Sequence, residues 1–154
     1  MEIYEEKDGF VKCVMRKKAL GLNSKMFSMF YQKSIFSDVD IASEFSENNP
    51  EEIFHGHKVI LAAFSRFLRK KFIRSQPGDI ILVENVSYKF LGYFFELVYY
   101  GKVLMASQDL DNFKAALRSL NVHFDDKPLM NFINDCEEDD ADDSFLNDNN
   151  NTYG

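Results

Sequence analysis

The chain has 154 residues, of which 45% are hydrophobic, and a formal net charge of -7. This length allows one domain with a core of its own but is short for two packed domains. The composition excludes disorder throughout, and no apolar run approaches the ~20 residues that cross a bilayer, so we expect no membrane association. Sixteen Phe and seven Tyr without any Trp predict a core rich in aromatic packing.

The charge is distributed unevenly along the chain. Residues 134–154 hold eight of the 25 acidic residues and none of the 18 basic ones, so residues 1–133 are nearly neutral. A neutral body has no long-range field that would steer DNA or RNA onto it, and we expect no direct nucleic-acid contact. Residues 136–154 are acidic and Asn-rich, which predicts a disordered tail.

The two cysteines, Cys13 and Cys136, form no Cys-x-x-Cys pair, and no secretory signal precedes them. We expect reduced thiols in an intracellular protein.

The first half of the chain predicts a strand, a helix and a hairpin. Residues 10–15 (FVKCVM) have the β-branched and aromatic content of a short strand. Residues 19–34 predict a helix that is apolar nearly all round, which needs either burial on both sides or a second molecule over one side. Residues 37–45 and 52–58 alternate as strands around an exposed turn, SENNPEE.

The second half predicts mostly helices. From Lys58 the period becomes helical, with a break near Ser65 into two short helices, and residues 79–83 form a compact strand. Ser87 is expected to cap a helix that ends at Gly101. After a short extended piece, KVLM, Ser107 is expected to cap a last good helix, and KPLMNFIND adds a weaker helical turn or two.

Four sequence words carry a family resemblance: FSDVDI (36–41), HGHKVILAAFSRFLRKKF (55–72), ILVENVSYKFLGYFFELVYYGKV (81–103) and DLDNFKAALRSLNV (109–122). In this order they resemble a BTB (POZ) domain. The resemblance implies an α+β fold, a cluster of short helices capped by a small mixed β-sheet, with an N-terminal strand available for exchange between subunits. We expect the domain at 9–124, a short C-terminal helical extension at 125–135 and the acidic tail at 136–154.

The chain is most similar to the BTB domains of zinc-finger and chromatin proteins, including the insect tramtrack group. It departs from the family pattern in the longer hairpin loop and in Arg66, where Pro is common. The resemblance implies a homodimer or higher even oligomer, with other BTB proteins and transcriptional cofactors as partners, in the nucleus or, alternatively, the cytoplasm. A complete chain and the N-terminal part of a longer zinc-finger protein both fit this pattern.

Two groups of residues are candidates for the interaction site. Asp38 and Lys58 match the two charges that approach each other in a pocket near the family's dimer axis, although a plain structural ion pair would explain them too. The apolar helix and the first strand, which the resemblance implies pairs near KVLM of the partner, predict the dimer interface: Phe10, Val11, Val14, Leu22, Met26, Met29 and Phe30.

Other functions find less support. His55 and His57 lack a third converging ligand, so no metal is expected, and the bases of RFLRKKFIR have the spacing of a solvated helix face. There is no Gly-rich phosphate loop and no nucleophile elbow, so we expect neither catalysis nor a cofactor. The alternative is a substrate adaptor of a cullin-type ubiquitin ligase, but IRSQPGD lacks the Glu of the adaptors' motif.

Overall fold

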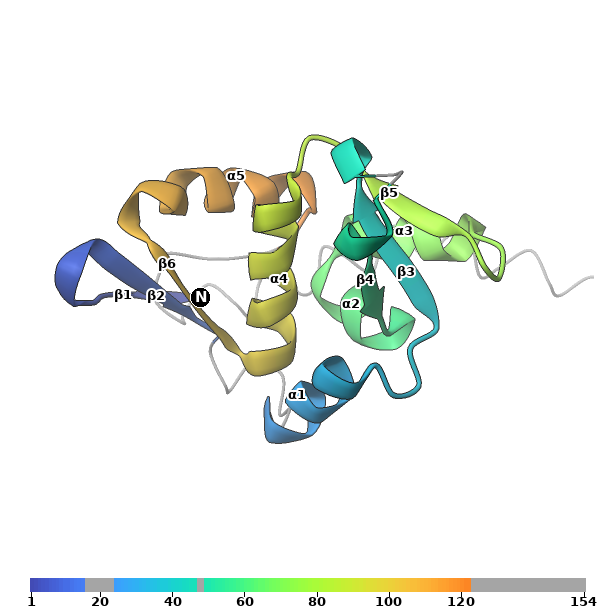
Figure 1. Ribbon diagram of the computed structural model, residues 1–154, viewed down its shortest axis with the longest axis horizontal. Helices are drawn as coiled ribbons and strands as arrows, with labels where there is room; N and C mark the ends of the chain where they lie inside the picture. The colour runs from blue at the N-terminus through green and yellow to red at the C-terminus, as the bar shows by residue number, and fades with distance from the viewer. Residues whose placement is uncertain (16–23, 47–48, 123–154) are drawn as a thin grey trace, which may run out of the picture. The chain divides into compact units, whose positions relative to one another are not determined.

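The computed structural model describes residues 1–15, 24–46 and 49–122, which lie in one compact unit, Met1–Phe124 (Figure 1). The expected C-terminal helical extension at 125–135, including KPLMNFIND, and the expected tail at 136–154 fall outside the described residues. Within the described part, no helix is long and apolar enough to span a membrane.

One sheet, here called sheet A, contains β1 (Glu2–Glu5), β2 (Phe10–Val14) and β6 (Lys102–Ala106), antiparallel in the order β1-β2-β6. Strand β2 is the strand predicted at the N-terminus. Strand β1 was not predicted, because its four residues, EIYE, alternate too little to mark a strand before β2 offers them a partner.

The pairing of β2 with β6 runs from Phe10 opposite Ala106 to Val14 opposite Lys102. The family resemblance implies that these two segments pair between subunits, and the single chain contains the same pairing within itself. Val11 and Cys13 of β2 face the core and are buried.

The second sheet, sheet B, contains β3 (Val39–Ser43), β4 (Phe54–Gly56) and β5 (Ile80–Val83) in the order β4-β3-β5. Strands β3 and β4 form the predicted antiparallel hairpin, whose long loop contains short 3-10 turns at Glu44–Ser46 and Pro50–Glu52. Strand β5 runs parallel to β3, so this sheet is mixed, as predicted. The expectation of one small sheet misses sheet A, whose strands come from the two ends of the domain.

Five α-helices are described. Ser65 produces the predicted break, since it ends one helix and caps the next: its hydroxyl accepts from the Leu68 N–H at 3.0 Å and donates to the Leu120 carbonyl at 2.6 Å. The helices are α1 (Ser24–Lys33), α2 (Lys58–Phe64), α3 (Arg66–Arg74), α4 (Tyr88–Tyr100) and α5 (Leu110–Ser119).

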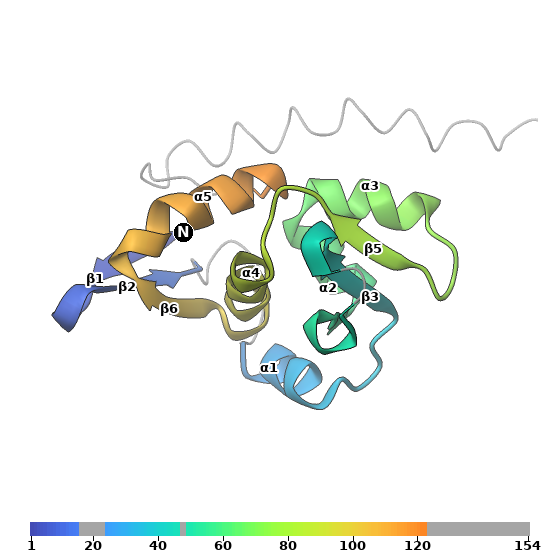
Figure 2. The same ribbon diagram turned by 45° about the horizontal axis from the view of Figure 1, so that its top comes forward.

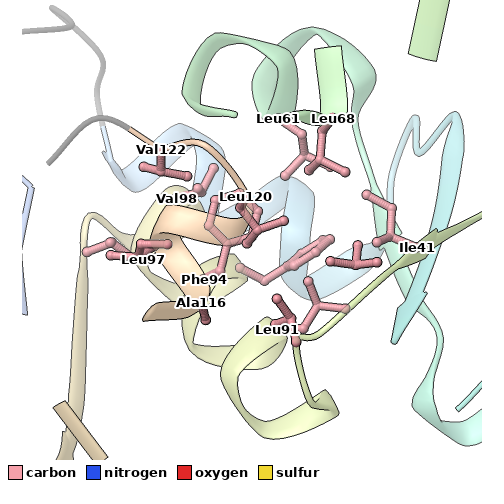
Figure 3. Packing of buried hydrophobic residues seen from close by; sticks show 14 of the residues in the cluster. Ile41, Leu61, Leu68, Leu91, Phe94, Leu97, Val98, Ala116, Leu120 and Val122 are labelled. Carbon is pink, nitrogen blue, oxygen red and sulfur yellow. The ribbon is translucent and has the colours of Figure 1, made fainter. Parts of the chain in front are cut away.

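Helix α4 lies between the two sheets and contacts both of them (Figures 1 and 2). It ends as predicted at Gly101, whose φ of 73° suits a left-handed C-cap. Its side chains Leu91, Phe94, Leu97 and Val98 meet residues of α2, α3, α5 and β3 in the core (Figure 3). This helix therefore joins the elements into one hydrophobic core.

Two predicted helix caps differ from the structure. Ser107 does not cap α5: it starts a 3-10 turn, Ser107–Asp109, and its hydroxyl donates to the Gly9 carbonyl at 2.8 Å. Ser87 does hold the N-cap position of α4, but its side chain makes no capping hydrogen bond. In the first case the hydroxyl forms a contact with the turn between β1 and β2, which sequence spacing cannot foresee.

Candidate functional site

The structure brings Asp38 and Lys58 together, through the backbone. Oδ1 of Asp38 accepts a hydrogen bond from the Lys58 N–H at 2.7 Å, and the Asp38 N–H donates to the Gly56 carbonyl at 3.0 Å. Among the described residues no ion pair joins the two side chains. The carboxylate therefore satisfies an N-terminal amide of α2, where negative charge also complements the helix dipole, and leaves the ammonium of Lys58 available.

A pocket of about 220 Å³ opens beside this contact. Three carboxylates and one ammonium line it, so its field favours a positively charged or hydrogen-bond-donating ligand. Each carboxylate already has a hydrogen-bond partner: besides Asp38, Asp40 accepts from Nδ1 of His55 at 2.6 Å, and Asp79 accepts from the Gln76 N–H at 2.7 Å. The lining residues are Ser37, Asp38, Val39, Asp40, Lys58, Ser75, Gln76, Gly78 and Asp79.

His57, the residue before Lys58, is buried in a hydrogen-bond network. Its Nε2 lies 2.6 Å from the Ile35 carbonyl, which can only accept, so Nε2 carries the proton and Nδ1 accepts. Nδ1 and the His57 backbone N–H both lie 2.9 Å from the Tyr99 hydroxyl, which donates to the first and accepts from the second. Burial raises the pKa of Tyr99 far above its usual value.

His57 holds the N-cap position of α2, so it ends the hairpin and starts this helix. His55 is exposed and pairs with Asp40. In the described part of the chain, no three His, Cys, Asp or Glu side chains gather as metal ligands would.

The residues predicted for the dimer interface differ in how exposed they are. Phe10 and Met29 are exposed, by 44% and 45%, while Val11 is buried in sheet A of its own chain and Val14 is partly buried. Phe30 is partly buried, with its ring 6.3 Å from that of Phe36 and 5.7 Å from that of His57. Leu22 falls outside the described residues, and Met26 lies in α1 with its side chain outside what is described.

The outer face of sheet A carries three exposed apolar side chains. Tyr4 and Leu104 stand opposite Lys12 from either side, and Phe10 lies two residues along the same strand, so all three share one face. Tyr4 is 50% exposed and Leu104 is 55% exposed. We call Tyr4, Phe10 and Leu104 the outer apolar face.

A hollow of about 960 Å³ borders this face between sheet A, α1 and α4. Glu96 lies in its wall, and partial burial raises the pKa of that carboxyl. Of the residues predicted for the interface, Phe10 lines the hollow. The full lining is Glu6, Lys7, Phe10, Lys12, Ser28, Glu96, Tyr100, Lys102, Val103 and Leu104.

Two more exposed apolar residues adjoin the Asp38–Lys58 contact in sequence. Phe36 is 81% exposed at a positive φ of 58°, a conformation that bulky residues rarely adopt, and Val59 is 79% exposed. Sequence reasoning missed both. An available signal was the place of Val59 in the first turn of the helix, directly after the charged Lys58.

Comparison with known proteins shows similarity to one domain family. A family model described as the BTB/POZ domain matches residues 27–136. Among solved structures 85 chains match, one of them the BTB domain of zebrafish PATZ1, with a TM-score of 0.52 and 19% identity over 81% of this chain and 92% of that one. No curated protein matches. The comparisons confirm the α+β fold class predicted from the sequence.

Proposed function

Because the chain belongs to the BTB/POZ family, whose domain is generally a protein–protein interaction module, we propose that it forms a homodimer that brings together regulators of transcription or chromatin in the nucleus. The nuclear and regulatory part rests on the resemblance of its sequence words to the BTB domains of zinc-finger and chromatin proteins.

The outer apolar face is the observation that carries the dimer. Tyr4, Phe10 and Leu104 lie together on one face of a three-stranded sheet, beside a hollow. Single exposed apolar residues are ordinary, but a group of them rimmed by charged residues is typical of an interface. Lys7 and Lys102 line the same hollow and supply such a rim, while Lys12 lies between Tyr4 and Leu104.

Strand exchange would use the pairing that the single chain already contains. Val11 and Cys13 are buried against the core by the pairing of β2 with β6. The same register formed between two subunits would bury the same side chains in the partner's core, which makes dimer formation and folding one process.

Partner recognition belongs to the pocket at Asp38 and Lys58. The pocket offers three carboxylates and the ammonium of Lys58, and the exposed Phe36 ring and Val59 methyl groups adjoin it in sequence. A peptide with a positively charged or hydrogen-bond-donating group beside an apolar side chain fits this chemistry.

The dimer is tested by light scattering on the full chain at micromolar concentration. We expect twice the chain mass of 17.9 kDa, and Leu104→Asp should lower the measured mass toward that of a monomer. Phe45→Asp is the matched control, since Phe45 is 74% exposed but lies in the hairpin loop at the end of sheet B. A wild-type chain that stays monomeric across the concentration range would refute the homodimer.

The partner is tested by pulldown from nuclear and cytosolic extracts with wild type and Val59→Asp. We expect transcriptional cofactors to be captured by the wild type and lost from Val59→Asp, which should keep its mass in light scattering. Capture of a cullin instead would favour the ubiquitin-ligase adaptor.

A further inference from the structure

Helix α3 presents a strongly basic surface that the proposed dimer does not use. Its nine residues, RFLRKKFIR, contain five bases and no acid. Leu68 and Phe72 face the core, while Arg69, Lys70, Lys71 and Arg74 are exposed; we call these four the basic face. Figures 1 and 2 place α3 on the opposite side of α4 from sheet A.

The charges of the basic face are not neutralised within the described part of the molecule. None of its four side chains forms an ion pair with an acidic residue there, whereas Lys12 pairs with Glu6 and Lys89 with Asp109. Lys71 makes a cation–π contact within the helix, with its ammonium 5.4 Å from the centre of the Phe67 ring. The face therefore keeps its full positive potential.

Helix stability alone does not account for this arrangement. Lys71 and Arg74 near the C-terminus complement the helix dipole, but Arg69 lies nearer the N-terminus, where positive charge is unfavourable. Lys70 and Arg74 are four residues apart and repel each other. An anion bound on this face would relieve both costs.

An exposed apolar residue lies among these charges. Ile73 is 79% exposed, with Arg69 and Lys70 one helical turn before it and Arg74 next to it. A phosphate backbone offers nothing to such a side chain, whereas a peptide offers both carboxylates and an apolar group. At about 1.5 Å per residue the helix is roughly 14 Å long, which matches a short peptide.

We propose that α3 is the docking surface for an acidic peptide segment of a partner protein, with its carboxylates on the basic face and one apolar side chain on Ile73. This surface lies apart from the outer apolar face, and its C-terminal end adjoins the pocket at Asp38 and Lys58, which Ser75 lines.

The probe is a short fluorescent peptide of Asp and Glu around one Leu, measured by anisotropy with the full chain. We expect binding that weakens as salt is added, and a rise in Kd of about tenfold or more in Lys70→Glu with Arg74→Glu. The matched control is Lys33→Glu with Arg118→Glu, which changes net charge equally at two exposed basic residues outside α3 and outside the outer apolar face, and should bind nearly as the wild type does. Ile73→Ser should weaken binding several-fold.

Three outcomes would overturn the proposal: equal loss in the control, equal binding of the peptide with Asn and Gln in place of the acids, or tighter binding of a DNA duplex to the same bases. If Lys70→Glu with Arg74→Glu fails to fold by circular dichroism, Lys70→Ala with Arg74→Ala replaces it. Light scattering on each variant separates failure of this surface from failure of the dimer, since the mass should not change.

Discussion

The network around His57 buries polar groups, whereas the outer face of sheet A exposes apolar ones. The network buries polar groups, and each of its donors and acceptors has a partner: the His57 ring and amide, the Tyr99 hydroxyl and the Ile35 carbonyl. The outer face leaves Tyr4, Phe10 and Leu104 44–55% exposed. A buried polar network stabilises one conformation, whereas an exposed apolar face gains free energy only when a second molecule covers it.

This contrast between the buried network and the exposed face predicts the largest loss of stability for a substitution at Tyr99. Tyr99→Phe removes one hydroxyl and leaves the His57 N–H and Nδ1 buried without partners, which should cost about 3 kcal/mol of unfolding free energy. Urea unfolding measures it. Tyr88→Phe makes the same chemical change on a ring that is 41% exposed, and should stay within about 0.5 kcal/mol of the wild type. Equal effects would show that the network contributes nothing specific.

Substitution of Ser65 should give the next largest loss of unfolding free energy, because Ser65 too is a buried polar residue whose hydroxyl is hydrogen-bonded. Ser65→Ala loses the cap on the Leu68 N–H and leaves the Leu120 carbonyl without its donor, at an expected cost of about 2 kcal/mol. Ser75→Ala is the control, since its hydroxyl bonds only to the Phe72 carbonyl at the partly buried end of α3, and should cost less than about 0.5 kcal/mol.

Substitutions on the outer apolar face should change stability mainly by weakening the dimer. Phe10→Ser removes apolar area that a monomer leaves 44% exposed, so a monomer should lose about 1 kcal/mol or less and a dimer more. The midpoint of wild-type unfolding should rise with protein concentration, and Phe10→Ser should reduce that dependence. A wild-type midpoint independent of concentration would contradict cover by a second copy.

Glu96 should give the smallest effect and a pH dependence of known sign. Burial raises the pKa of this carboxyl in the folded chain, so its ionisation opposes folding as pH rises from the unfolded pKa through the folded one. Glu96→Gln should therefore stabilise slightly at neutral pH, within about 0.5 kcal/mol, and have no such effect in acid, where both states are protonated. Unfolding at both pH values tests it, and a gain confined to acid would contradict it.

Local sequence signals predicted the helices well. The break at Ser65, the left-handed end of α4 at Gly101 and the β3–β4 hairpin all follow from residues within a few positions of each other. These features depend on caps, turn residues and periodicity, which act over one or two turns of chain. The BTB fold itself was identified from sequence words spread over most of the domain.

The sequence predicted that Asp38 and Lys58 approach each other, but not which atoms make the contact. Asp38 and Lys58 do meet, yet the carboxylate binds an amide of α2 where an attraction between side chains was expected. Backbone amides carry no sequence signature, so spacing cannot reveal such a partner.

Sequence alone thus determined the helix order and the acidic segment at 134–154, because composition and short-range periodicity are properties of the chain itself. Tertiary structure alone decided that β1 is a strand, that β5 runs parallel to β3, and that Ser107 bonds to Gly9. It also decided which apolar residues remain exposed. Phe10 and Val11 are neighbours in one strand, and their side chains point to opposite faces of the sheet. Because β2 pairs with β6, Val11 is buried against the core and Phe10 lies on the outer face.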